Sequence, residues 1–323
     1  MSLLEVSGRG DYPEVLKLLE NGADINACNE DGETALILAS WNGHTEVVRL
    51  LIAHGADVHA CEDGDTALFL ACDNGHTQIA RLLIENGANV HASNNEGDTA
   101  LILACDKGHT QIARLLIENG ANVNVCNNEG DTALVLASYN GHTEVVRLLI
   151  ENGANVNVCN NNGNTAFILA SFKGHIDIVR LLIQHDADVY ACNNNGDTAS
   201  IWASKQGHID VVRLLIEHNA DVHARNNTGK TSLIMASFNG HTDLVRLLIK
   251  HGADVKVCTN NGDTALTLAS TRGHLDAVRI LTEAIRHDAA RLIQARWRFV
   301  STYPNHAMCR RRLQREFAEL VPT

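Results

Sequence analysis

The sequence predicts an all-α solenoid of helix-turn-helix repeats with projecting hairpin loops, followed by a C-terminal helical tail. The first observation is a turn glycine that recurs after one step of 32 residues and then steps of 33, a period typical of solenoids. The second is a pair of short amphipathic segments in each copy, and the third is an Asn- and Gly-rich stretch that favours a loop. The recurring glycines are Gly32, Gly64, Gly97, Gly130, Gly163, Gly196, Gly229 and Gly262.

The copy from Gly130 to Gly163 illustrates the first helix. Thr132 is expected to cap it, because its hydroxyl can accept the free N–H groups of a helix start. The helix should run through Tyr139 and end at Gly141-His142.

The second helix of the same copy is expected to begin at a Thr143 cap and to end at Gly153, which can adopt a left-handed conformation. Its broad apolar surface comprises Val145, Val146, Leu148, Leu149 and Ile150. Two helices this short cannot bury their apolar faces alone, so each copy should form core for its neighbours. Residues 154–163 should then project as a hairpin-like loop.

These motifs resemble the ankyrin repeat: Gly-x-Thr-Ala-Leu, then Gly-His, then Leu-Leu-Ile-x-x-Gly-Ala-Asp/Asn-Val. The resemblance covers Ser2 to Leu281 and implies about nine repeats over residues 1–281, the first a degenerate cap. It departs from the family where Ala replaces the usual Pro and Ile, Phe or Val replaces the usual His. The substituted positions are Ala35, Ala67, Ala100 and Ala133, and Ile37, Phe69, Ile102 and Val135. Members of this family bind many unrelated partners, so the resemblance implies a monomeric, non-enzymatic adaptor or scaffold for another protein.

The ends of the array depart from the pattern. Glu5 stands where later copies have leucine, as suits a terminal cap. Asp186 and Asn219 replace the glycine after the second helix and should adopt left-handed conformations. The second copy is one residue short before Gly64, which should only trim its loop.

Residues 282–323 are predicted to form a separate, basic helical tail. The last repeat helix can run on through about Phe299, and after Pro304 a further helix is expected around residues 306–320. The tail has eight arginines against four acids, a net charge of +4. Because the whole chain has a net charge of −12, residues 1–281 have a net charge of −16. An acidic array repels nucleic acid and anionic membranes. The basic tail can bind the array's own acidic surface or another acidic protein.

Composition points to a folded protein of the cytosol or nucleus. Hydrophobic residues make up 45% of the chain, yet no apolar run could span a bilayer and the N-terminus does not resemble a signal peptide. Six of the nine cysteines occupy one loop position: Cys28, Cys61, Cys126, Cys159, Cys192 and Cys258. Stacked layers about 8–10 Å apart would keep these thiols beyond disulfide reach. No Cys/His spacing indicates zinc.

No catalytic or cofactor-binding set emerges. Residues 228–231 resemble the end of a phosphate-binding loop, but Ala224 stands where that loop needs glycine. Eight of the seventeen histidines recur at one position, His44, His76, His109, His142, His175, His208, His241 and His274, and are expected to bridge the helix turn by hydrogen bonds. One such group per layer does not converge as catalysis requires.

The candidate binding positions are those that vary while the frame stays fixed. Just before Gly-His, at the end of each first helix, stand Trp41, Asp73, Asp106, Tyr139, Phe172, Lys205, Phe238 and Thr271. We expect the aromatic members, Trp41, Tyr139, Phe172 and Phe238, to act as binding anchors; the alternative is that neighbouring side chains cover the rings.

One residue after each turn glycine lies a ladder of mostly carboxylates: Glu33, Asp65, Asp98, Asp131, Asn164, Asp197, Lys230 and Asp263. These carboxylates either face a partner or serve only the helix dipole. If both sets bind, the partner offers a basic segment with apolar anchors.

The tail segment Ile293-Gln294-Ala295-Arg296-Trp297-Arg298 is similar to the first half of an IQ motif. Phe299 and Tyr303 stand where that motif has Gly and a second basic residue. The resemblance implies calmodulin binding through Ile293, Gln294, Trp297 and Arg298, and hence a calmodulin-regulated module. The alternative is a helical cap in which Ile293, Trp297 and Val300 pack on the last repeat.

Overall fold

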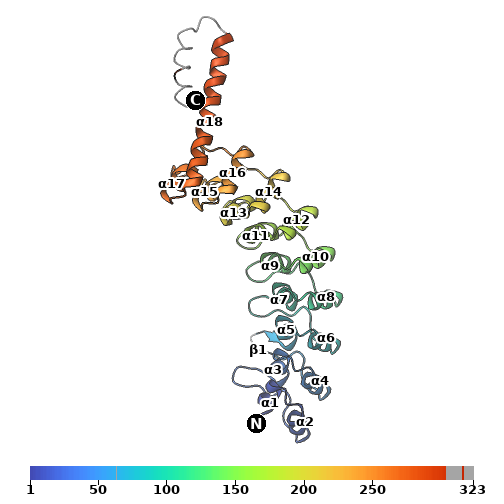
Figure 1. The fold of residues 1–323 in the computed structure, drawn as a ribbon. Coiled ribbons are helices and arrows are strands. Elements are labelled where there is room, and N and C mark those ends of the chain that lie inside the picture. Colours follow the sequence, from blue (N-terminus) through green and yellow to red (C-terminus); the bar gives the residue numbers. More distant parts are fainter. Residues whose placement is uncertain (63, 303–314, 316–323) are drawn as a thin grey trace. The chain divides into compact units, whose positions relative to one another are not determined.

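The computed structural model describes residues 1–62, 64–302 and Arg315. Helices dominate it, in nine successive pairs (Figure 1). They are α1 Leu3–Arg9, α2 Tyr12–Glu20, α3 Ala35–Trp41, α4 Thr45–Ala53, α5 Ala67–Asp73, α6 Thr77–Glu85, α7 Ala100–Asp106, α8 Thr110–Glu118, α9 Ala133–Asn140, α10 Thr143–Glu151, α11 Ala166–Lys173, α12 Ile176–Gln184, α13 Ala199–Gln206, α14 Ile209–Glu217, α15 Ser232–Phe238, α16 Thr242–Lys250, α17 Ala265–Thr271 and α18 Leu275–Thr302. The predicted repeat solenoid is confirmed.

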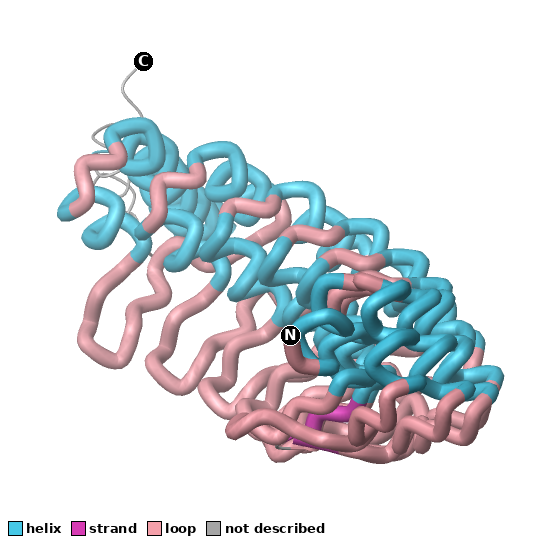
Figure 2. Tube along the Cα trace, turned by 90° about the horizontal axis from the view of Figure 1, so that it is seen from below, coloured by secondary structure: helices cyan, strands magenta, loops and turns pink. Residues whose placement is uncertain are grey.

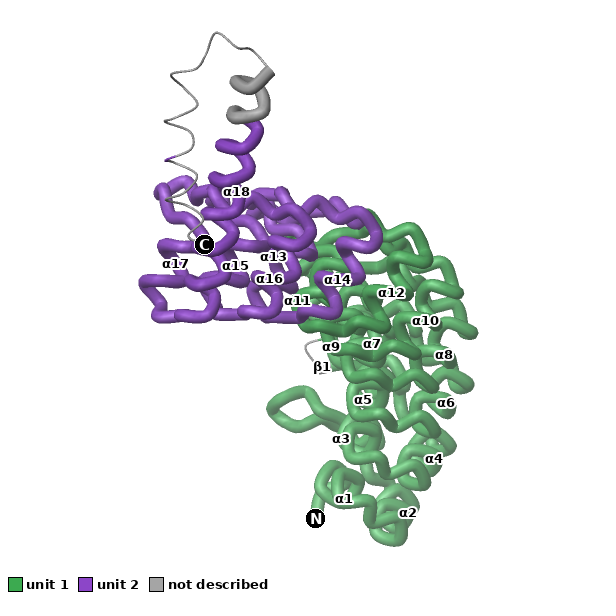
Figure 3. Tube along the Cα trace, turned by 45° about the horizontal axis from the view of Figure 1, so that its top comes forward, with its two compact units in different colours: residues 1–188 green, residues 189–323 purple. Residues whose placement is uncertain are grey.

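The helices form two compact units, residues 1–188 and 189–323 (Figure 3). In the first unit the odd-numbered helices α1 to α11 pack side by side in one layer and the even-numbered helices α2 to α12 in a second. In the second unit α13, α15 and α17 form one layer, and α14, α16 and α18 the other. The core lies between these layers, as Leu134, Val146 and Leu149 in the first unit show by exposures of 1% or less.

A threonine starts every first helix from α3 onward. Each threonine hydroxyl accepts the backbone N–H three residues on, as Thr132 does from Val135, and so satisfies one free N–H of the helix start. The prediction for the second helices is wrong: the cap of α10 is His142, and Thr143 is its first helical residue. The histidine side chain makes no cap hydrogen bond, because its ring is used elsewhere.

Within each unit, the loops of successive repeats lie side by side along one edge of the helices (Figure 2). Most are closed by a single β-bridge, such as Cys126 to Thr132. In the loop that is one residue short, two strands form instead, β1 Cys61–Glu62 and β2 Asp65–Thr66, paired antiparallel. Shortening therefore tightens this hairpin without disturbing α5, which still begins after its threonine cap.

The irregular positions behave as predicted. Asp186 and Asn219 have φ of 62° and 63°, the only non-glycine residues with positive φ in the described part of the chain. Glu5 is exposed on α1 and pairs with Arg9. Helix α18 continues without interruption from the last repeat through residue 302, past the predicted boundary at Leu281. The helix expected around residues 306–320 lies outside the described residues, Arg315 apart.

Candidate functional site

The aromatic positions at the ends of the first helices differ in exposure. In the first unit Trp41 ends α3 and is 49% exposed, while Tyr139 on α9 and Phe172 on α11 are half-buried. In the second unit Phe238 ends α15 and is also half-buried. Trp41 therefore offers the largest free ring surface of the four.

Cations explain part of the cover on the other rings. The Lys173 ammonium lies 4.2 Å from the ring centroid of Tyr139 and 5.8 Å from that of Phe172. In the second unit the Arg272 guanidinium lies 4.2 Å from the centroid of Phe238. Contacts of this geometry are attractive at exposed sites. For Tyr139 and Phe238 the cation stands one residue beyond the aromatic position of the following repeat, whereas Lys173 directly follows Phe172. The sequence signal was therefore a Lys or Arg just after this position.

Trp41 meets a different neighbour. The equivalent residue of the following repeat is Asn74, whose side-chain amide donates to its own helix at the carbonyl of Leu70, 2.9 Å away. A short amide that is bonded within α5 does not cover an indole, which accounts for the exposure of Trp41.

The carboxylate ladder is less available than the sequence suggested. Asp98 and Asp131 are only 9% and 8% exposed. Each accepts a hydrogen bond from an asparagine of the next hairpin, Asp98 from Asn127 Nδ2 at 2.9 Å and Asp131 from Asn160 Nδ2 at 2.8 Å. The adjacent hairpin therefore covers both carboxylates, and a role of Asp98 and Asp131 in binding a partner stays a prediction.

Burial raises the pKa of both Asp98 and Asp131, while the asparagine hydrogen bonds lower it and neighbouring carboxylates raise it further. The remaining aspartates of the set, Asp65, Asp197 and Asp263, are half-buried. Asp197 belongs to the second unit and accepts from Asn226 Nδ2 at 2.7 Å, the same contact in another repeat. Some carboxylates of the ladder therefore bond to the next repeat, and some remain partly exposed to solvent.

Two equivalent pockets lie between first helices and the loops beside them. The pocket of the first unit, here the acidic pocket, has a volume of about 420 Å³ and is lined by Asp65, Phe69, Leu70, Asp73, Asn94, Asn95, Glu96, Asp98 and Leu103. The pocket of the second unit, here the Lys230 pocket, measures about 410 Å³ and is lined by Thr228, Lys230, Ile234, Met235, Phe238, Thr259, Asn260, Asn261, Asp263 and Leu268. Sequence reasoning identified some residues of each pocket but missed their apolar floors.

The lining of the acidic pocket combines four carboxylates with the apolar side chains of Phe69, Leu70 and Leu103. One cation reaches its edge, since Lys107 Nζ lies 3.8 Å from Asp73 Oδ1 and 3.3 Å from Asp106 Oδ2. Opposite charges and an apolar base are the features that hold the stem and head of a long basic side chain.

The recurring histidines are structural, but not as predicted. His142 Nε2 lies 2.8 Å from the carbonyl oxygen of Asp106 in the preceding repeat, and His44, His76, His109, His175, His241 and His274 make the same contact at 2.9–3.1 Å. They tie neighbouring repeats together and do not bridge their own turn. Glycine is required beneath the ring: Gly108 has φ 79°, and a Cβ there would lie 2.5 Å from His142 Nδ1.

The loop asparagines also join repeats. Asn124 Oδ1 accepts the backbone N–H of Asn155 at 2.9 Å, and Asn157 Oδ1 that of Asp188 at 2.9 Å. Both side-chain amides donate to a carbonyl of the next repeat, that of Gly153 and that of Asp186 respectively.

In the tail, Ile293 is 8% exposed and Gln294 is exposed. The side chains of Trp297 and Arg298 lie outside the described part of the structure. None of the helices described has the length and hydrophobicity that a bilayer crossing needs. Within the same residues, no three His, Cys, Asp or Glu side chains converge as a metal site would require.

Comparison with known proteins agrees with this architecture. The family model described as ankyrin repeats matches residues 3–94, 87–160, 152–226 and 221–290. Among curated proteins, the chain is 48% identical over 59 residues to the bovine (Bos taurus) Ankyrin repeat domain-containing protein 49, a match covering 18% of this chain and 25% of that protein.

It is also 46% identical over 59 residues to the mouse (Mus musculus) 2-5A-dependent ribonuclease and 45% identical over 56 residues to the human (Homo sapiens) mitochondrial disaggregase. These matches cover 18% and 17% of this chain and 8% of each relative. The chain thus matches 8–25% of the length of these relatives.

Proposed function

The chain belongs to the ankyrin repeat family, and we propose that it is a non-enzymatic adaptor that binds a partner protein through the ends of its first helices and the loops beside them. Ankyrin repeats are general protein-interaction modules. The observation that carries the proposal is the acidic pocket with its apolar lining residues, in the same unit as the exposed ring of Trp41. Exposed aromatic side chains are frequent binding hot spots.

The partner of the first unit is proposed to present a basic segment with apolar anchors. A Lys or Arg side chain would lay its stem on Leu70 and Leu103 and its charge among the four carboxylates. Asp98 contributes its field from a buried position, while Asp65, Asp73 and Glu96 are placed for direct contact. Tyr139 and Phe172, which share the cation of Lys173, would act as secondary anchors.

The experiment is an affinity capture with the full chain as bait, quantified by mass spectrometry against two variants. Trp41→Ala removes the exposed ring, and Tyr12→Ala removes a ring that is 40% exposed on the second helix α2, away from the proposed surface. We expect Trp41→Ala, and not Tyr12→Ala, to lower recovery of a specific partner at least tenfold, the effect typical of a hot spot. Raising the salt concentration should weaken the same partner.

A partner retained equally by the two variants would refute this assignment of the surface. A large drop in melting temperature for Trp41→Ala would also count against it, because it would show that the ring belongs to the core. The compartment in which this binding takes place is proposed to be cytosol or nucleus.

The calmodulin alternative is given a lower place because Phe299 and Tyr303 stand where an IQ motif has Gly and a second basic residue. We expect the full chain not to bind calmodulin with or without calcium, as measured by titration calorimetry. Calcium-dependent binding would reverse this order.

A further inference from the structure

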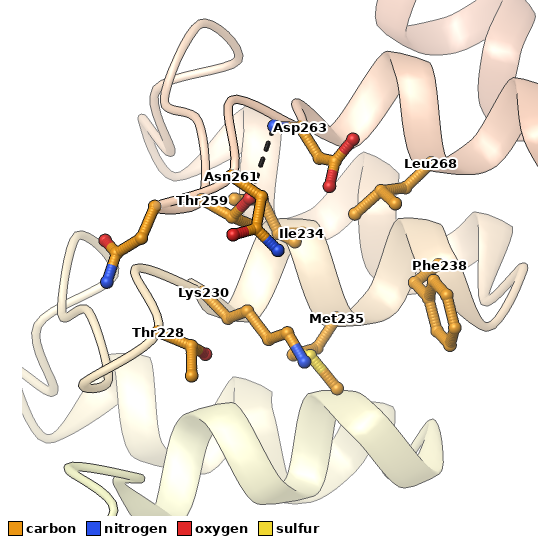
Figure 4. Close-up of a pocket in the computed structure, with 10 residues that line it drawn as sticks. Thr228, Lys230, Ile234, Met235, Phe238, Thr259, Asn261, Asp263 and Leu268 are labelled. Carbon is orange, nitrogen blue, oxygen red and sulfur yellow. Dashed lines mark hydrogen bonds between the residues drawn. The ribbon is translucent and has the colours of Figure 1, made fainter.

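The Lys230 pocket lies wholly within the second unit, between α15, α17 and the two loops that precede them (Figure 4). Met235 of α15 and Leu268 of α17 line it from opposite sides, Phe238 lies at one end, and the Lys230 side chain extends toward Met235. Its volume of about 410 Å³ falls in the range of sites that hold small ligands or single recognition side chains.

The residues that line this pocket occupy the same repeat positions as those of the acidic pocket, 165 residues further along the chain, but most of the charged side chains differ. Lys230 stands in the place of Asp65, Phe238 in that of Asp73, and Asn261 in that of Glu96. Only the acid at Asp98 keeps its counterpart, Asp263. The site that holds four carboxylates in the first unit therefore holds one cation and one carboxylate in the second.

Lys230 is unfavourable for local stability. It directly precedes Thr231, the cap of α15, where the positive end of the helix dipole repels a cation. It also removes the carboxylate that would accept a bond from the next hairpin, as Asp197 accepts from Asn226. At the matching place in that hairpin, Thr259 replaces the asparagine. Both partners of the inter-repeat bond have thus changed together, and such local sacrifices are typical of functional positions.

The ammonium of Lys230 is available. Within residues 1–62 and 64–302, no carboxylate oxygen forms an ion pair with it, although Lys107 in the first unit pairs with two. Asp263, the one acid of the pocket, precedes the cap of α17 and is favoured there by the dipole of that helix. Arg272, at the Phe238 end, adds a second cation above the ring.

The apolar side of the pocket is ready to receive a side chain. Phe238 and Leu268 are half-buried, whereas Met235 is 8% exposed and Ile234 is 1% exposed. A large apolar group placed here would cover Met235 and the free face of Phe238, and methionine adapts its shape to such ligands.

We infer that the Lys230 pocket binds an acidic peptide segment of the partner in which a large apolar residue adjoins a carboxylate. The apolar side chain fills the space over Met235 and Leu268, and the carboxylate pairs with Lys230. This inference rests on the proposed function, and it assigns to the second unit a ligand of opposite charge to that of the acidic pocket.

The test uses the full chain with [¹³C-methyl]methionine labelling, because Met235 is one of three methionines and lines the pocket. Its methyl signal is assigned with Met235→Leu. Three capped dipeptides are titrated: Ac-Phe-Asp-NH₂, Ac-Phe-Asn-NH₂ and Ac-Phe-Lys-NH₂. We expect the Met235 methyl to shift saturably, with about fivefold tighter binding of the Asp peptide than of its isosteric Asn counterpart, as a partly exposed ion pair would give.

Three variants make the result independent of folding. Lys230→Gln should abolish the preference for the Asp peptide, whereas Lys256→Gln, the same change at an exposed lysine outside the pocket, should leave it intact. The double variant Lys230→Asp, Thr259→Asn restores the pair seen at Asp197 and Asn226, so it should melt higher than the wild type and yet lose the preference.

A Met235 methyl that none of the peptides moves would overturn the inference. So would equal affinity for all three peptides, or an equal effect of the two single variants. These outcomes leave the Trp41→Ala capture result untouched, so failure of the pocket is distinguishable from failure of the proposed function.

Discussion

Replacing Asn127 by alanine should destabilise the first unit more than its half-exposed position suggests. Its Nδ2 donates to Asp98 at 2.9 Å, and its Oδ1 accepts the backbone N–H groups of Glu129 at 3.1 Å and Asp131 at 2.9 Å. One side chain therefore shapes its own hairpin and holds the preceding repeat.

The magnitude follows from these three bonds. A neutral hydrogen bond contributes about 0.5–1.5 kcal/mol and one to a charged group about 1.5–3 kcal/mol. The sum is about 2.5–6 kcal/mol, and water that enters the half-exposed site recovers part of it. We expect Asn127→Ala to lower the free energy of unfolding by about 2–3 kcal/mol.

Urea unfolding gives the global effect, and amide hydrogen exchange locates it, because repeat arrays open locally. The amides of Glu129 and Asp131 should lose protection first. Asn162→Ala is the matched control: that residue is exposed, and its side chain makes none of the bonds seen at Asn127. It should stay within about 0.5 kcal/mol of the wild type.

A double-mutant cycle with Asp98→Ala isolates the inter-repeat bond and should give a coupling of about 1.5–3 kcal/mol. A loss below about 1 kcal/mol for Asn127→Ala, or a coupling near zero, would refute the view that these asparagines hold the repeats together.

Two further perturbations test the energetics of the first unit. Ser138 is fully buried and its hydroxyl has no hydrogen-bond partner. Ser138→Ala should raise the melting temperature, because burying an unsatisfied polar group costs about 1–3 kcal/mol. Ser270→Ala should not raise it, because Ser270, at the same repeat position, is exposed and its hydroxyl donates to the carbonyl of Leu266. Burial raises the pKa of Asp98, so the native state binds its proton more tightly and this residue's contribution to stability falls as pH rises above about 3.9. In thermal melts, the melting temperature of Asp98→Asn minus that of the wild type should therefore be larger at pH 7 than at pH 3.5. If this difference in melting temperature does not change with pH, the raised pKa of Asp98 is contradicted.

Periodicity was sufficient to predict the helical pairs, because the apolar spacing and the threonine caps are local properties of each copy. The left-handed conformations of Asp186 and Asn219 were predictable for the same reason, since both occupy a glycine position. The tail helix followed from the absence of a stop signal after Leu281, and α18 indeed runs to Thr302.

What the sequence did not reveal are contacts between copies. The bond from Asn127 to Asp98 joins residues 29 apart, and that from His142 to the carbonyl of Asp106 joins residues 36 apart. Which residues meet across two repeats depends on how one repeat stacks on the next, and the sequence of a single copy does not determine that stacking. For that reason the sequence left open whether Asp98 faces a partner, whereas in the structure the next hairpin covers it.

These contacts distinguish the residues that hold neighbouring repeats together from the residues that are available to bind a partner. Polar residues that recur at one position in most copies, such as His142 and Asn127, bond to the neighbouring repeat, so a partner would have to break those bonds to use them. At a position that varies from copy to copy, the Trp41 indole forms no hydrogen bond to the neighbouring repeat within the described residues, whereas Asp106, at the same position of a later copy, accepts one from Asn140 Nδ2 at 2.8 Å. Lys230 is the informative exception, because it varies at a position where Asp131 and Asp197 form cohesive bonds. Selection for binding is expected to favour a repeat that loses an inter-repeat bond where a pocket is present. A double variant at Lys230 and Thr259 that is more stable than the wild type but does not prefer the acidic peptide would demonstrate this loss of stability for binding.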